Sequence, residues 1–169
     1  MSSHAKPLDG IILMGPFGSG KSYLGNRLNV RGIAHYADLE GLIYQRFGNR
    51  DEFNLASATE FLRNHYHEHL SLPGLAAFES TGVVQRPLLL EVIDQYEIAL
   101  VHVVTPKQIC LDRVAKRNIA SRNPIGHNKA AEFFEYWINE IAPTYQFSVE
   151  VDGTDEEAAV RAIEVLANH

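Results

Sequence analysis

The sequence has few cysteines and no long apolar run, the features that mark disulfide-rich and membrane-spanning proteins. Cys110 is the single cysteine among 169 residues, so an internal disulfide is excluded. No metal-ligand spacing surrounds it, and we interpret it as a packed thiol in a reducing cytoplasm. No apolar run approaches the roughly 20 residues that a membrane-spanning helix needs. Residues 1–7 contain no apolar stretch, so we expect no secretory signal there.

Charge and composition further limit the class of protein to which this chain can belong. The chain has 15 Lys and Arg residues against 21 Asp and Glu, and this net charge of −6 argues against broad nucleic-acid binding. A content of 46% hydrophobic and 21% charged residues is typical of a globular protein, and the length suits one domain. We therefore expect a single cytoplasmic domain over residues 1–169, a monomer or weak dimer, with no nucleic-acid or membrane partner.

One stretch matches the phosphate-binding pattern G-x-x-x-x-G-K-[ST] at every fixed position. It lies between an apolar run at 11–14, which predicts a buried strand, and a helical pattern at 21–29. Glycines allow consecutive N–H groups to converge on phosphate oxygens, and the helix that follows directs its positive end at the same anion. The alternative is a Gly-rich turn without a ligand. The motif consists of Gly15, Pro16, Phe17, Gly18, Ser19, Gly20, Lys21 and Ser22.

The motif predicts a nucleoside triphosphate and Mg²⁺ as cofactors. Lys21 can reach the β- and γ-phosphates, and the Ser22 hydroxyl can complete the shell of a magnesium ion. Tyr23 and Arg113 are further candidates for nucleotide contacts.

Strands and helices alternate along the rest of the chain. This alternation predicts an α/β fold, a parallel sheet covered by helices on both faces. Ligands of such sheets bind beyond the carboxyl ends of the strands. The predicted strands are 11–14, 32–37, 75–78, 98–104 and 147–151.

Acidic residues follow two of these strands. Asp38 comes after the second strand and Glu79 after the third. Carboxylates at this edge can hold Mg²⁺ or accept the proton of an attacking hydroxyl, although each residue alone is also a common helix cap. We predict Asp38 as a catalytic residue and magnesium ligand, and Glu79 as a residue of the acceptor site.

A cationic stretch lies late in the chain. Between 113 and 131 there are five cations and no acid, around a loop with proline and glycine, which favours a mobile lid over phosphates at about 113–128. The alternative is a set of cations attracted by the carboxyl end of a helix. We expect Arg117 and Arg122 to close over a transferred phosphoryl group. The predicted catalytic residues are therefore Lys21, Asp38, Arg117 and Arg122.

These motifs, taken in order, resemble those of the small phosphate-loop kinases, most of all shikimate and gluconate kinases, with adenylate kinase more distant. Gly25 and Leu28 continue the G-K-S-T-x-G-x-x-L run of that group, and Pro143 and Tyr145 match its P-x-Y. The resemblance implies a three-layer P-loop NTPase fold with five strands in the order 2-3-1-4-5. It also implies an acceptor-binding insert at about 38–72 and transfer of the γ-phosphoryl group of ATP.

The chain departs from that pattern at several positions. Tyr23 stands where the group has Thr or Ser, Ser80 begins a run that replaces three glycines, and Ile141 replaces an acceptor-binding arginine. These departures weigh against shikimate as the acceptor. The predicted acceptor-site residues are Asp38, Arg63, Glu79, Thr81, Gly82 and Arg86.

The sequence therefore predicts an ATP-dependent kinase that acts on a hydroxyl of a small polar metabolite. Two alternatives stay open, a nucleoside monophosphate kinase and a non-catalytic regulatory protein that binds ATP.

Overall fold

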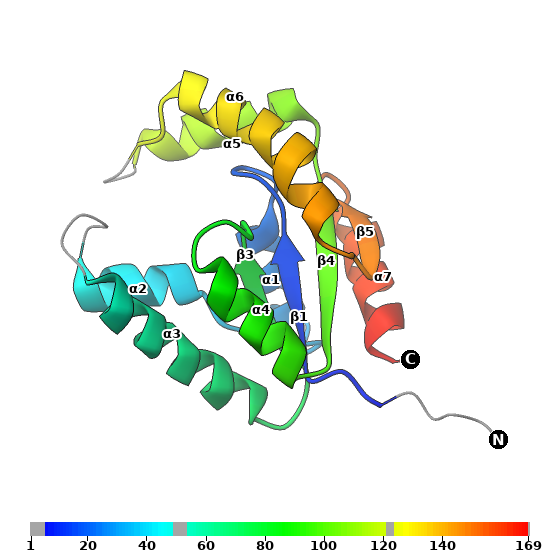
Figure 1. Cartoon of the computed structure of the whole chain (residues 1–169). Coiled ribbons are helices and arrows are strands. Elements are labelled where there is room, and N and C mark those ends of the chain that lie inside the picture. The colour runs from blue at the N-terminus through cyan, green and yellow to red at the C-terminus, as the bar shows by residue number, and fades with distance from the viewer. Residues whose placement is uncertain (1–5, 49–53, 121–123, 169) are drawn as a thin grey trace.

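The computed structural model describes residues 6–48, 54–120 and 124–168, and it has an α/β fold (Figure 1). Its sheet is parallel, with the strand order β2-β3-β1-β4-β5. This order confirms the predicted one. The strands are β1 (Gly10–Met14), β2 (His35–Tyr36), β3 (Ala76–Ser80), β4 (Ile98–Val104) and β5 (Val149–Asp152).

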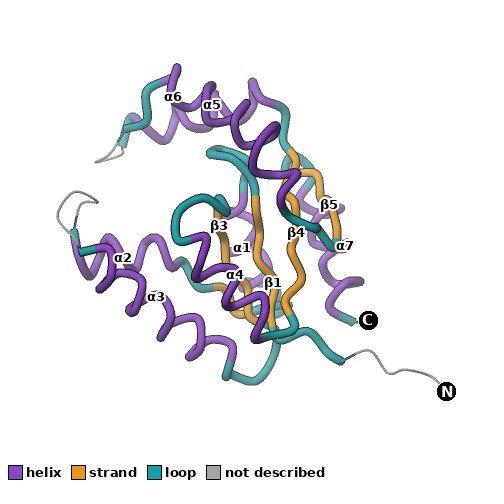
Figure 2. Tube along the Cα trace, viewed as in Figure 1, coloured by secondary structure: helices purple, strands orange, loops and turns teal. Residues whose placement is uncertain are grey.

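Helices cover both faces of the sheet, so that the molecule has three layers (Figure 2). The inner faces of α1 and α7 pack on one side of the sheet, and α3, α4 and the π-helical turn η2 pack on the other. The helices are α1 (Lys21–Val30), α2 (Leu39–Phe47), α3 (Leu55–Leu70), α4 (Arg86–Gln95), α5 (Lys107–Asn118), α6 (His127–Tyr136) and α7 (Glu156–Ala167), with the short turns η2 (Trp137–Ile141) and η3 (Ala142–Thr144).

Helices α5 and α6 lie together across the end of the sheet toward which β1 points (Figure 1). They pack through Leu111 and Val114 of α5 and Ala130 of α6. The Asn118 side chain donates to the carbonyl of Ile125 at 2.6 Å and accepts from its N–H at 2.9 Å. These two bonds close the connection between the helices, and α6 begins at His127.

The segment after β3 is held firmly at the same edge. Trp137 Nε1 donates to the carbonyl of Thr81, and the Tyr145 hydroxyl donates to that of Gly82, both at 2.7 Å. The bond from Tyr145 is buried and Trp137 itself is fully buried, so water competes little with these contacts. The elements after β4 thus fix the backbone that leaves β3.

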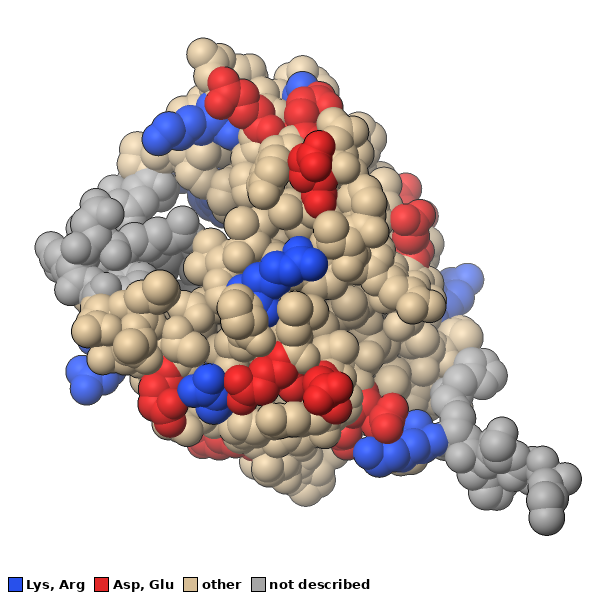
Figure 3. Space-filling view, in the orientation of Figure 1, with Lys and Arg blue, Asp and Glu red and all other residues tan. Residues whose placement is uncertain are grey.

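The described part of the chain contains no helix both long and apolar enough to span a bilayer. On the face shown in Figure 3, the Lys and Arg side chains of the described residues are interspersed with Asp and Glu. Cys110 is buried, as predicted, and burial raises the pKa of its thiol. The thiol is therefore protonated and unreactive at neutral pH.

Gly25 on α1 leaves room for the ring of Tyr36. A Cβ atom at position 25 would lie 2.4 Å from two carbon atoms of that ring. Overpacking of this kind costs about 1–3 kcal/mol, and the better helix propensity of alanine returns about 1. We expect Gly25→Ala to lower the free energy of unfolding by about 1 kcal/mol, and by no more than about 2, in urea titrations.

Gly126→Ala is the matched control, because a Cβ atom there meets nothing within 4 Å. If Gly25→Ala has the same urea midpoint as Gly126→Ala, the packing of Tyr36 on α1 is not as described.

Candidate active site

The loop between β1 and α1 has the tight curl that its motif predicts. Gly18 and Gly20 have φ angles of 77° and 99°, which residues with a side chain rarely adopt. A Cβ atom at position 18 would also lie 2.3 Å from the carbonyl oxygen of Cys110. Backbone conformation and packing therefore both demand glycine at position 18, and the loop leads directly into a helix N-terminus, where anions bind.

Lys21 lies folded over this loop. Its Nζ donates to the carbonyl oxygens of Gly15 at 2.9 Å and Pro16 at 2.8 Å, and the residue is buried. A buried ammonium group is tolerated only when hydrogen bonds replace its water. These carbonyls hold the cation over the loop, at the edge of the cavity described below.

Two further residues anchor the loop to the rest of the fold. Thr105 Oγ1 donates to the carbonyl of Ser19 at 2.8 Å. The Arg113 guanidinium donates to the carbonyls of Gly18 at 3.2 Å, Ser19 at 3.3 Å and Gly153 at 3.0 Å. Arg113 thus connects α5, the loop and the segment after β5.

A cavity of about 210 Å³ opens at the loop, and we call it the phosphate cavity. Arg113 and Arg117 enter it from α5, and Glu79 from β3. Arg122, the other predicted catalytic arginine, lies outside the described residues. The lining is Phe17, Gly18, Gly20, Lys21, Ser22, Tyr23, Glu79, Ser80, Thr81, Arg113, Val114 and Arg117.

Ser22 and Glu79 form the contact that joins the loop to the neighbouring strand. Ser22 Oγ donates to Glu79 Oε2 at 2.7 Å, and Glu79 stands opposite Leu13 in the parallel pairing of β1 with β3. A hydroxyl beside a carboxylate is the kind of oxygen pair that binds Mg²⁺ in phosphate-loop proteins. The residues present therefore fit a magnesium ion, with Glu79 as the acid beside Ser22.

Asp38, predicted as that acid, has other contacts. Its Oδ1 accepts from the N–H of Gly41 at 2.8 Å at the start of α2, and its side chain lines neither of the two cavities described here. These are the contacts of a helix cap, the alternative that the sequence left open. Burial raises the pKa of Tyr36, and the charges of Glu79 and Asp38 raise it further, so Asp38 is still near this edge.

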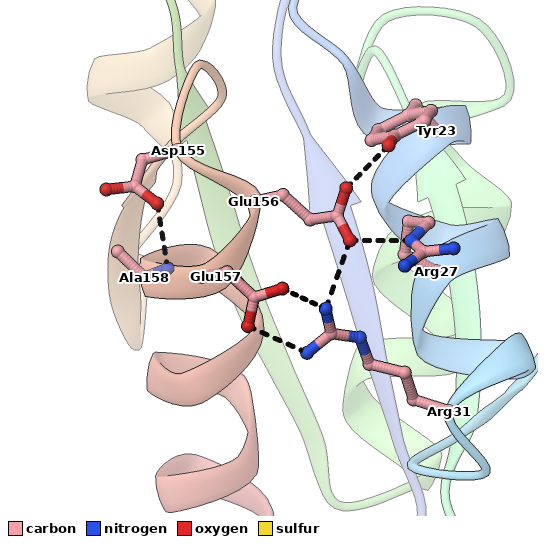
Figure 4. Close-up of polar contacts among 7 residues, drawn as sticks. All are labelled: Tyr23, Arg27, Arg31, Asp155, Glu156, Glu157 and Ala158. Atoms are coloured by element: carbon pink, nitrogen blue, oxygen red, sulfur yellow. Dashed lines mark hydrogen bonds and ion pairs between the residues drawn. The ribbon is translucent and has the colours of Figure 1, made fainter.

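Tyr23 is held by α7 at the rim of the phosphate cavity (Figure 4). Its hydroxyl donates to Glu156 Oε2 at 2.5 Å, while Arg27 Nε donates to the other oxygen of Glu156 at 2.6 Å. Arg31 pairs with both Glu156 and Glu157. Tyr23 is 61% exposed. Its hydroxyl is turned toward α7 by this network of hydrogen bonds and ion pairs, which joins α7 to α1.

A second cavity, of about 350 Å³, lies next to the phosphate cavity, and we call it the acceptor cavity. The two share Phe17, Glu79, Ser80 and Thr81, which form the boundary between them. Thr81 was predicted for this site. The full lining is Phe17, Leu39, Ile43, Leu55, Leu62, Tyr66, Glu79, Ser80, Thr81, Val83, Val84, Gln85, Leu89 and Phe133.

The structure does not bring Arg63 and Arg86, two predicted acceptor residues, into this lining. Arg63 pairs with Glu91 at 2.9 Å and with Glu60 at 2.7 Å. Arg86 donates to Thr144 Oγ1 at 2.9 Å and stacks over the ring of Tyr145. Both guanidinium groups are thus engaged by neighbouring elements of the fold. Gly82, whose carbonyl accepts a hydrogen bond from Tyr145, is likewise absent from the described lining.

Comparison with solved structures identifies the fold. The chain superposes on a shikimate kinase from Bacteroides thetaiotaomicron with a TM-score of 0.64 at 18% identity, covering 95% of this chain and 98% of that one. A gluconokinase from Sinorhizobium meliloti gives 0.59 at 15% identity, with coverage of 96% and 94%. A shikimate kinase from Acinetobacter baumannii in complex with shikimate gives 0.58 at 18% identity, with coverage of 95% and 94%.

The chain has the fold of the small phosphate-loop kinases. No protein-family model matches its sequence, and a search of curated proteins found no match either.

Within this kinase fold, the sequence did not decide which aromatic and aliphatic side chains form the acceptor side of the site. Phe17 of the loop stacks on Phe133 of α6 with ring centroids 4.3 Å apart, and both line the acceptor cavity. In the sequence, Phe133 belongs to a helical apolar pattern that equally describes a core residue. Only the packing of α6 against the loop distinguishes the two roles.

We expect Lys21→Ala to weaken binding of ATP·Mg²⁺ about 10- to 100-fold in calorimetry, because hydrogen bonds to charged groups contribute about 1.5–3 kcal/mol. Lys116→Ala is the control, since Lys116 is an exposed lysine of α5 outside the phosphate cavity. Equal affinities of the two variants would contradict a phosphate-binding role for Lys21.

Proposed function

We propose that this protein transfers the γ-phosphoryl group of ATP to a hydroxyl group of a small molecule. The observation that supports this most is the shared boundary of the two cavities at Phe17, Glu79, Ser80 and Thr81. Phosphoryl transfer requires a donor and an acceptor side by side, with charged groups around the transferred phosphate. A phosphate cradle that opens into a second cavity supplies this arrangement.

The residues of the phosphate cavity would have separate roles in binding ATP, the phosphoryl donor. The loop amides and Lys21 would bind the β- and γ-phosphates, and Arg117 would offset negative charge from α5. Ser22, with Glu79 beside it, would hold Mg²⁺, which when bound neutralises charge on the phosphate oxygens. Arg113 keeps the loop in position through its three carbonyl contacts.

Glu79 is the described carboxylate that lines both cavities. It is therefore the residue best placed to orient an acceptor hydroxyl and to accept its proton. This role passes to Glu79 from Asp38, whose contacts are those of a helix cap. The role of Arg122, a mobile lid at 113–128, the cytoplasmic location and the monomeric or weakly dimeric state stay predictions.

The two alternatives from the sequence fit less well. A nucleoside monophosphate acceptor needs cations for its phosphate, and the described lining of the acceptor cavity contains neither Lys nor Arg. A regulatory protein that only binds ATP has no use for a second cavity joined to the first.

The test is release of ADP from ATP·Mg²⁺ with and without a panel of small alcohols, sugar acids and nucleoside monophosphates. We expect at least one alcohol to raise ADP release above the background hydrolysis. If none of the panel does so while ATP binds, the protein is not a kinase of this kind.

Glu79→Gln should lower acceptor-dependent turnover about 100-fold or more, because it removes a proton acceptor while retaining an oxygen for Ser22. ATP affinity, measured by calorimetry in the absence of Mg²⁺, should change far less. Glu132→Gln on the exposed side of α6 is the matched control. Asp38→Asn decides between the two acids, since a loss as large as that of Glu79→Gln would return the role to Asp38.

A further inference from the structure

The acceptor cavity has a lining that does not suit a polar metabolite. Its side chains are mostly aliphatic and aromatic, contributed by α2, α3, the segment after β3, α4 and α6. Among the described residues of this lining, Glu79 is the one charged group, and it lies at the boundary with the phosphate cavity. The described lining of this cavity therefore offers no cation to an anionic acceptor.

The two arginines that the sequence predicted for the acceptor, Arg63 and Arg86, are committed elsewhere. Arg63 is held between Glu60 and Glu91 on the outer side of α3 and α4. Arg86 bonds to Thr144 and lies 4.7 Å from the centroid of the Tyr145 ring. Moving either guanidinium into the cavity would break hydrogen bonds or stacking that already stabilise the fold.

Polar side chains are a minority of the described lining, and two of them already accept a hydrogen bond within the fold. Ser80 Oγ accepts from the N–H of Gly82 at 2.9 Å, and the side-chain carbonyl of Gln85 accepts from Thr59 at 2.8 Å. The Thr81 carbonyl accepts from Trp137. A polyol would exchange its water for a lining that is mostly apolar, where most of its hydroxyls would lack partners.

Apolar side chains make up most of the cavity lining. Phe17 and Phe133 present stacked rings, and Leu39, Leu62 and Tyr66 are buried side chains of the core on this face of the sheet. Such a surface binds apolar groups by removing their area from water. The cavity volume of about 350 Å³ lies at the small end of the range for ligand sites, about 300–1,000 Å³.

We infer that the acceptor is a neutral alcohol with a compact apolar body, aromatic or alicyclic, and a single hydroxyl directed at Glu79. This inference rests on the proposed function and specifies its substrate class. The body lies against Phe17, Phe133 and the aliphatic wall, and the hydroxyl reaches the boundary of the two cavities. It replaces the polar metabolite that the sequence predicted.

The transfer forms one bond to the γ-phosphorus and breaks another. The hydroxyl oxygen forms a bond to the γ-phosphorus as the bond from that phosphorus to the β-phosphate oxygen breaks, and ADP leaves with the electron pair. The hydroxyl proton passes to the carboxylate of Glu79 and from there to solvent. The products are a phosphate monoester, ADP and a proton.

The experiment compares acceptors of similar size. Benzyl alcohol, 2-phenylethanol and cyclohexylmethanol represent the inferred class, and gluconate, shikimate and AMP represent polar or anionic acceptors. ADP release from ATP·Mg²⁺ is measured with each, and thermal-shift titration of the ADP·Mg²⁺ form reports binding independently of turnover. We expect the three alcohols to bind and to stimulate ADP release, and the three anions to do neither.

A pair of valine substitutions tests the location. Val84, 56% exposed, lines the acceptor cavity, whereas Val30, 73% exposed, is at the end of α1 and outside it. Val84→Lys should raise the KM for the alcohols about tenfold, the scale of one lost apolar contact, with little change in ATP affinity. Val30→Lys should leave both unchanged. Because both valines are exposed, neither change threatens folding.

The outcomes separate this inference from the proposed function. Stimulation by an anion but not by the alcohols would overturn the acceptor class and leave the kinase assignment standing. Binding of the alcohols without ADP release from any acceptor would overturn both. Equal effects of Val84→Lys and Val30→Lys on KM would overturn the location of the acceptor in this cavity.

Discussion

The hydrogen bond between Ser22 and Glu79 joins the two strands on which the candidate site is built. Strands β1 and β3 are parallel neighbours, so both end at one edge of the sheet. One continues into the phosphate loop and the other into the segment that lines the acceptor cavity. A single carboxylate at the end of β3 can therefore serve the metal side of the donor and the hydroxyl of the acceptor.

The surroundings keep this edge rigid. Arg113 and Thr105 hold the loop from one side, while Trp137 and Tyr145 hold the carbonyls that follow Ser80 from the other. Preorganised donors and acceptors cost no rearrangement when the substrate binds. Lys21 follows the same logic, because the loop carbonyls satisfy its buried charge and keep it beside the phosphate cavity.

The acceptor cavity is continuous with the core of one face of the sheet. Leu39, Leu62, Tyr66 and Leu89 belong to that core and also line the cavity. Side chains around a cavity forgo packing partners, which destabilises a fold unless a ligand supplies them. Apolar side chains that line an opening beside a phosphate loop therefore indicate a ligand with apolar groups. The same side chains packed against one another would carry no such indication.

The sequence by itself determined the fold class, the phosphate loop and the glycines that shape it, because these depend on local periodicity and local backbone geometry. The strand order followed from resemblance, and the structure agrees with it. What only the tertiary structure decided is which acid meets Ser22 and what the acceptor cavity is made of. Asp38 and Glu79 both follow strands, but β3 lies beside β1 whereas β2 is one strand further away. Contacts between strands, like the packing of Phe133 on Phe17, depend on segments distant along the chain, and local patterns carry no record of them.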